Sequence, residues 1–99
     1  MTVERRYDKR FPVDFGVSFR FHGNEILCSR AQDISNRGMG IQTDTATPER
    51  GMLVELQISI NGHDWEVPAI VTHSVPGHMG VMFHDPQPGL CEAAILEET

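Results

Sequence analysis

The chain has 99 residues, 39% of them hydrophobic and 22% charged, which is typical of a single globular domain. Its apolar runs are far shorter than the roughly 18 residues of a membrane span, and no apolar segment follows the charged N-terminus as in a signal peptide. We therefore expect a cytoplasmic protein with no membrane span, in which Cys28 and Cys91 are reduced.

The charge is unevenly distributed along the chain. Residues 1–10 hold four basic and two acidic side chains, whereas residues 11–99 hold four arginines against twelve acidic residues, a net charge of −8. An acidic body repels a long polyanion, so we expect no binding to duplex nucleic acid. The same charge distribution does not exclude a small anion that the basic cluster at the N-terminus holds.

The first half of the chain predicts three strands. Residues 11–21 place an apolar side chain at every second position, which indicates a half-buried strand with an aromatic face. A turn at residues 22–24 leads to a second, less regular strand at 26–34. The turn formers of residues 35–40 run into a short strand at 39–43, and residues 44–51 read as a loop.

The second half predicts a hairpin, a last strand and a helix. Alternating apolar residues at 52–60 are followed by Asn61-Gly62, the strongest short signal for a hairpin, and by a return strand from Trp65 to Val71. Pro68 removes a backbone donor from that strand, which predicts an edge position or a bulge. A turn at residues 76–77 precedes a strand at 79–83, and residues 89–98 are predicted as a short helix. Six short strands favour an antiparallel sandwich or a small barrel.

Two short motifs lie before the first predicted strand and after the second. Residues 5–10 read RRYDKR, in which Arg6 and Arg10 have the spacing R-x-x-x-R. Residues 33–38 read DISNRG, which is D-x-S-x-x-G at Asp33, Ser35 and Gly38. Alone, the first motif is typical of a solvated tail and the second of a turn. In this order, around six predicted strands, the pair is much more specific.

With these motifs the chain resembles the PilZ family over nearly its whole length. The resemblance includes both motifs, the aromatic first strand, the continuation into GMGI and the G-V-M-F strand at 80–83. It implies an all-β fold, a six-stranded antiparallel β-barrel of the split-barrel type with a short C-terminal helix. Residues 1–10 would form a flexible arginine-rich ligand-binding arm and residues 11–99 the barrel domain. It also implies a bacterial receptor for the second messenger cyclic di-GMP.

The chemistry of the motif residues suits a ligand with two phosphates and two guanines. The guanidinium groups of Arg6 and Arg10 can bind phosphate, or guanine O6 and N7, as a planar fork, and can stack on a purine. The Asp33 carboxylate can accept from guanine N1–H and N2–H, and the Ser35 hydroxyl can donate to a phosphate or base oxygen. Gly38 allows a close approach of the backbone to the ligand, because it has no Cβ.

Three more basic residues complete the predicted ligand-binding set. The resemblance implies that an arginine directly before R-x-x-x-R favours two stacked ligand molecules over one, and Arg5 holds that place. Lys9 and Arg37 are further candidates, Arg37 through a phosphate. We expect the ligand to bridge the arm to the DISNRG surface, and the ordered arm to present a new face to a downstream protein effector. The resemblance implies control of motility, biofilm or surface polysaccharide.

Other functions have less support in the sequence. No nucleophile turn, P-loop or G-x-G-x-x-G motif marks an enzyme, so no catalytic residue is predicted. The five histidines lack ligand spacing, so no metal site and no cofactor besides the ligand is expected. Single-stranded nucleic acid would need exposed aromatics in a basic groove, whereas the aromatics here alternate into a core. The remaining alternative is a PilZ-like protein interaction module that binds no nucleotide.

Overall fold

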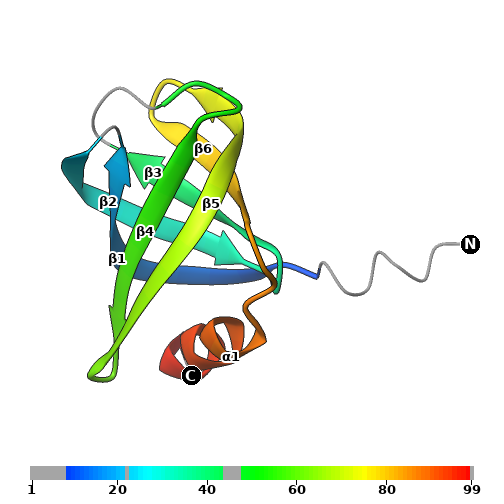
Figure 1. Ribbon diagram of the computed structural model, residues 1–99. Helices are drawn as coiled ribbons and strands as arrows, with labels where there is room; N and C mark the ends of the chain where they lie inside the picture. Colours follow the sequence, from blue (N-terminus) through cyan, green and yellow to red (C-terminus); the bar gives the residue numbers. More distant parts are fainter. Residues whose placement is uncertain (1–8, 22, 44–47, 99) are drawn as a thin grey trace, which may run out of the picture.

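The protein is described by a computed structural model over residues 9–21, 23–43 and 48–98 (Figure 1). These residues form six strands and one helix in chain order. The elements are β1 (Phe11–Phe21), β2 (Asn24–Ile34), β3 (Gly38–Thr43), β4 (Leu53–Ile60), β5 (His63–Val75), β6 (His78–Phe83) and α1 (Pro88–Glu98).

The six strands close into one antiparallel barrel. Their order around it is β1-β2-β3-β6-β5-β4, and every neighbouring pair is antiparallel. The closing pair, β1 with β4, is short and joins Ser18, Phe19 and Arg20 to Gln57, Leu56 and Glu55. This confirms the six-stranded antiparallel barrel that the family resemblance implies, and it excludes the sandwich.

The barrel interior is built from the alternation seen in the sequence. In β1, Val13, Phe15, Val17 and Phe19 are buried, and the residues between them face outward or are half-buried. The core continues through the inward positions of the other strands. Phe11 and Phe21, at the two ends of β1, are only half-buried and pack against the core from its margin. An aromatic strand therefore supplies much of the apolar area that stabilises this small domain.

The β4–β5 hairpin has the turn that its sequence predicts. Ile60 pairs directly with His63, and Asn61 and Gly62 have φ values of 53° and 83°. Both central residues of a type I′ turn need positive φ, which asparagine and glycine adopt at low cost.

Pro68 lies in β5 just outside its pairing with β6, so the predicted edge position holds only locally in a closed barrel, and there is no bulge here. It pairs with Glu55 of β4, while the pairing of β5 with β6 begins only at Ala69. The Pro68 carbonyl accepts from the backbone N–H of His84 at 2.8 Å, just beyond the end of β6. Because the N and O of a strand residue face the same side, the missing N–H of Pro68 also faces away from β4. The bulge falls instead between Val71 and His73.

Helix α1 packs at one end of the barrel, near the β4–β5 turn (Figure 1). Its buried side chains are Leu90, Cys91 and Ala94, which join the barrel core. Burial raises the pKa of the Cys91 thiol. No helix of the described residues is long and apolar enough to cross a membrane.

Candidate functional site

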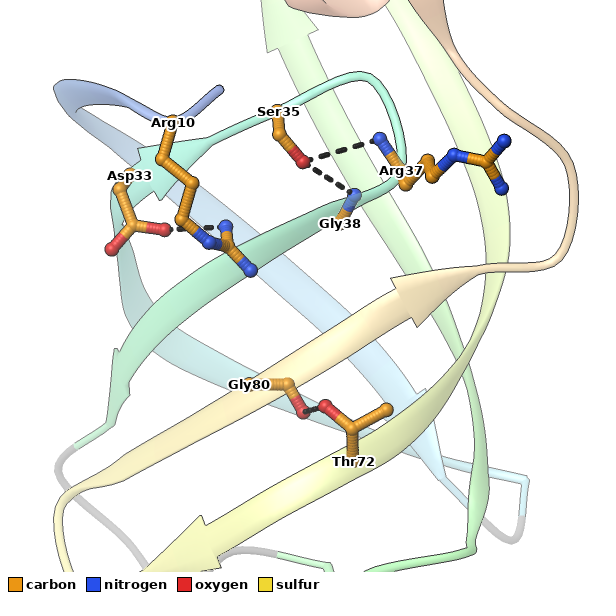
Figure 2. Close-up of polar contacts among 7 residues, drawn as sticks. All are labelled: Arg10, Asp33, Ser35, Arg37, Gly38, Thr72 and Gly80. Atoms are coloured by element: carbon orange, nitrogen blue, oxygen red, sulfur yellow. Dashed lines mark hydrogen bonds and ion pairs between the residues drawn. The ribbon is translucent and has the colours of Figure 1, made fainter. Parts of the chain in front are cut away.

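The two sequence motifs meet through an ion pair. Arg10 lies directly before β1, and the register of β1 with β2 pairs Phe11 with Ile34 and Pro12 with Asp33. This register brings Arg10 Nη1 to 2.7 Å from Asp33 Oδ1, although the residues are 23 positions apart in sequence (Figure 2). The two side chains are 48% and 36% exposed. An ion pair this exposed is screened by water and contributes about 0–1 kcal/mol to stability, so a ligand can replace it at low cost.

Ser35 holds the turn that leads from β2 into β3. Its buried Oγ accepts from the backbone N–H groups of Arg37 and Gly38, both at 3.2 Å, and its own N–H donates to the Gly38 carbonyl at 2.9 Å (Figure 2). These contacts are typical of a serine that replaces backbone partners in a tight turn. Because the hydroxyl acts as an acceptor in both side-chain bonds, its proton can still serve as a donor.

Gly38 is required by the packing of β3 on β6. A Cβ at this position would lie 2.4 Å from the backbone oxygen of Val81. The pairing of the strands alone therefore explains why this residue is glycine. The predicted close approach of its backbone to a ligand stays a prediction.

Gly40 is a residue of this site that the sequence motifs do not contain. It is the direct β3 partner of Asp33, and a Cβ on Gly40 would lie 2.8 Å from Asp33 Oδ2. The Asp33 carboxylate thus lies directly over Gly40. Because Gly40 has no Cβ, the carboxylate has room to face Arg10. The sequence contains a signal that could have identified Gly40. It lies two residues after Gly38 of the motif on the same strand, so the two glycines share a face.

The remaining predicted basic residues lie apart from the ion pair or outside the described residues. The Lys9 ammonium lies over the Phe11 ring, 5.5 Å from its centroid, which is a cation–π contact. Arg37 is exposed, and its side chain extends away from Arg10 and Asp33 (Figure 2). Arg5 and Arg6 are not among the described residues, and neither is the predicted arm except for its last two positions.

A shallow hollow of about 280 Å³ lies beside the ion pair on the outer face of the barrel. Arg10, Ser35, Arg37 and Gly38 line it together with three residues of β5 and β6, which are Thr72, Val81 and Met82. The Thr72 hydroxyl donates to the Gly80 carbonyl at 3.3 Å (Figure 2). Neither sequence motif contains Thr72 or Met82, because only the pairing of β3, β6 and β5 brings them here.

A comparison with protein-family models decides the family. The model of the PilZ domain matches residues 4–97. The chain belongs to the PilZ family. PilZ domains are receptor or binding modules rather than enzymes, and the family is in general one of cyclic di-GMP receptors. A comparison with curated proteins finds no match.

The PilZ fold is also seen in a solved structure. The crystal structure of the PilZ domain of CeSA from a cellulose synthesizing bacterium matches with a TM-score of 0.68. The match covers 88% of this chain and 91% of that chain at 16% sequence identity. At this identity the likeness shows the fold alone, which is the closed six-stranded barrel with one short C-terminal helix.

Other features of the PilZ barrel do not join this site. A wider hollow of about 620 Å³ crosses β1, β2 and β4, and none of the predicted ligand-binding residues lines it. Within the described part of the chain, no three His, Cys, Asp or Glu side chains lie together as metal ligands would. The ion pair, the Ser35 turn and the adjoining hollow are therefore the candidate ligand site.

Proposed function

We propose that this PilZ protein is a bacterial receptor that binds cyclic di-GMP and passes the signal to a partner protein. The observation that carries the proposal is the 2.7 Å contact between Arg10 and Asp33, which joins the two motifs at one exposed site. Arginine supplies a planar donor fork and aspartate supplies acceptors. Together they match the acceptor and donor edges of guanine and the charge of a phosphate.

In the proposed complex the ligand replaces the ion pair with bonds of its own. Arg10 donates to a phosphate or to guanine O6 and N7, and Asp33 accepts from guanine N1–H and N2–H. Arg6, Ser35 and Gly38 complete the site, with Lys9 and Arg37 as further phosphate contacts. Arg5 adds positive charge and favours two stacked ligand molecules over one.

The proposed output is a surface that a downstream protein reads. The ligand links the N-terminal arginines to the turn at residues 33–38, and the joined surface differs from that of the free protein. We place this receptor in the cytoplasm, in the control of motility, biofilm or surface polysaccharide. No resident cofactor is part of the proposal.

One observation favours the alternative, an interaction module that binds no nucleotide. Leu53, Ile70 and Met82 are direct partners across β4, β5 and β6 and form an apolar row on the outer face. Leu53 is 74% exposed and Met82 is 48% exposed. Exposed apolar rows of this kind are common at protein–protein contacts.

Isothermal titration of cyclic di-GMP distinguishes the two functions, with GTP as the control ligand. We expect saturable heat for the wild type and an affinity roughly tenfold to a hundredfold lower for Arg10→Ala, since hydrogen bonds to charged groups contribute about 1.5–3 kcal/mol. Arg30→Ala is the matched control, because Arg30 also forms an exposed ion pair, with Asp14 at 2.6 Å, but does not line the hollow.

The molar ratio of the titration reports whether one or two ligands bind. Absence of heat with the wild type would overturn the receptor and favour the interaction module. An equal loss of affinity in Arg10→Ala and Arg30→Ala would show that net charge matters rather than the site.

A further inference from the structure

Two histidines lie side by side on the outer surface of the β5–β6 hairpin. The ring centroids of His73 and His78 are 5.8 Å apart, and the rings meet edge to face at 62°. The pairing of β5 with β6 makes the two residues diagonal neighbours, close enough for long side chains to touch. Among the described residues, neither ring has a hydrogen-bond or ion-pair partner, whereas His84 Nδ1 lies 3.2 Å from the Asp85 carboxylate.

A β-bulge in β5 turns His73 to this outer face. Val71 is buried, and regular alternation would place His73 on the same inner side. The pairing shifts between Val71 and His73, so that Thr72 and His73 are both exposed. Bulges often re-aim a side chain in this way. The direct β6 partner of His73 is Gly80, which has no side chain to separate His73 from His78.

A tight turn fixes the position of the second histidine. Val75 pairs directly with His78, so only two residues form the turn, and Gly77 there has a φ of 85°. The Gly77 carbonyl accepts from the backbone N–H of Thr43 at 3.0 Å, which ties the turn to the end of β3. His78 itself is half-buried. The backbone therefore holds both imidazoles on one face before any ligand arrives.

The separation of the two rings suits a shared metal ion. With metal–nitrogen bonds of about 2.0–2.1 Å, two imidazoles on one tetrahedral ion have ring centres about 5 Å apart. A small side-chain rotation closes the difference from the observed 5.8 Å. Imidazole nitrogen suits Zn²⁺, Cu²⁺ and Ni²⁺, whereas Mg²⁺ and Ca²⁺ need oxygen ligands. No third His, Cys, Asp or Glu of the described residues joins the pair, which leaves the other positions on the ion to water.

We propose that His73 and His78 form a binding site for a divalent transition-metal ion of the zinc type. The ion bridges β5 and β6, and it stabilises the folded protein because only the folded hairpin brings the two ligands together. Neither histidine lines the hollow beside Arg10, so this site is separate from the candidate ligand site. The inference therefore does not depend on the proposed function.

The test is isothermal titration of ZnCl₂ into the full chain without an affinity tag, with thermal denaturation alongside. We expect saturable heat at one ion per chain, and none with MgCl₂. His73→Ala and His78→Ala should each lower the affinity at least about tenfold, because a single imidazole lacks the effective concentration that its neighbour supplies. Zn²⁺ should raise the melting temperature of the wild type but not that of either variant.

His63→Ala is the matched control. His63 is an exposed histidine at the start of β5, next to the β4–β5 turn, and pairs with Ile60 rather than with a second histidine. Its variant should bind Zn²⁺ as the wild type does. Without metal, all three variants should melt as the wild type does, since each replaced ring lies on the outer surface.

Three outcomes would overturn the site. The first is absence of heat when ZnCl₂ is added to the wild type. The second is wild-type affinity in both His73→Ala and His78→Ala, which would place the ion elsewhere. The third is an equal loss of affinity in His63→Ala, which would show that any surface histidine serves. If His78→Ala lowers the melting temperature without metal, His73→Ala decides, because unchanged affinity there would overturn the site alone.

Discussion

Two glycines of the G-M-G segment have different physical tasks, although they lie two residues apart. At Gly38 a Cβ would lie 2.4 Å from a backbone oxygen of Val81, which cannot move without separating β3 from β6. We expect Gly38→Ala to lower the free energy of unfolding by about 1–3 kcal/mol, as overpacking does elsewhere. Urea denaturation followed by the fluorescence of Trp65, the single tryptophan, measures this. Unchanged stability would show that the pairing of β3 with β6 can adjust to a Cβ at this position.

At Gly40 the neighbour that must yield is the end of a side chain. Its Cβ would lie 2.8 Å from the Asp33 carboxylate, which can rotate away from Arg10. We expect Gly40→Ala to change stability by less than about 1 kcal/mol, because the exposed ion pair contributes little, and to weaken cyclic di-GMP binding in titration. A variant that binds normally would show that Asp33 need not lie where the structure places it.

At the scale of elements, local sequence patterns predicted where the strands lie better than they predicted how the strands pair with one another. The alternation of β1 and the turn at Asn61-Gly62 depend on residues next to each other in sequence, and both are found. The position of the bulge depends on how β5 pairs with β6, which no local signal contains. The same contrast between local and long-range signals applies to the residues of the candidate site. The motifs named Arg10 and Asp33, but only strand register adds Thr72.

The β4–β5 turn offers a test at this scale. Gly62 has a φ of 83°, a conformation that costs an L-residue about 1–2 kcal/mol. We expect Gly62→Ala to lower the free energy of unfolding by about that amount, while Asn61→Gly leaves it nearly unchanged. Both variants should bind cyclic di-GMP as the wild type does, since the turn does not line the hollow. Lost binding in Gly62→Ala would mean that the barrel transmits strain to the site.

At the scale of the whole molecule, charge separates small anions from long ones. Residues 11–99 carry a net charge of −8, whereas Lys9 and Arg10 are the last two residues of the basic cluster at positions 5–10. The proposed ligand has only two phosphates, so it needs no positive charge beyond that cluster. Duplex DNA carries a charge about every 1.7 Å along its axis, so its further phosphates would lie over the acidic barrel. At a Debye length of about 8–10 Å that repulsion is still felt.

Competition binding measures this selectivity directly. We expect unlabelled cyclic di-GMP to displace a fluorescent analogue from the protein at physiological salt, while duplex DNA at the same phosphate concentration leaves the anisotropy unchanged. Lowering the salt should not make DNA a competitor, because weaker screening strengthens its repulsion by the acidic body as well as its attraction to the arginines. Equal displacement by DNA would mean that local positive charge alone drives binding. The donor and acceptor geometry at Arg10 and Asp33 would then contribute no selectivity.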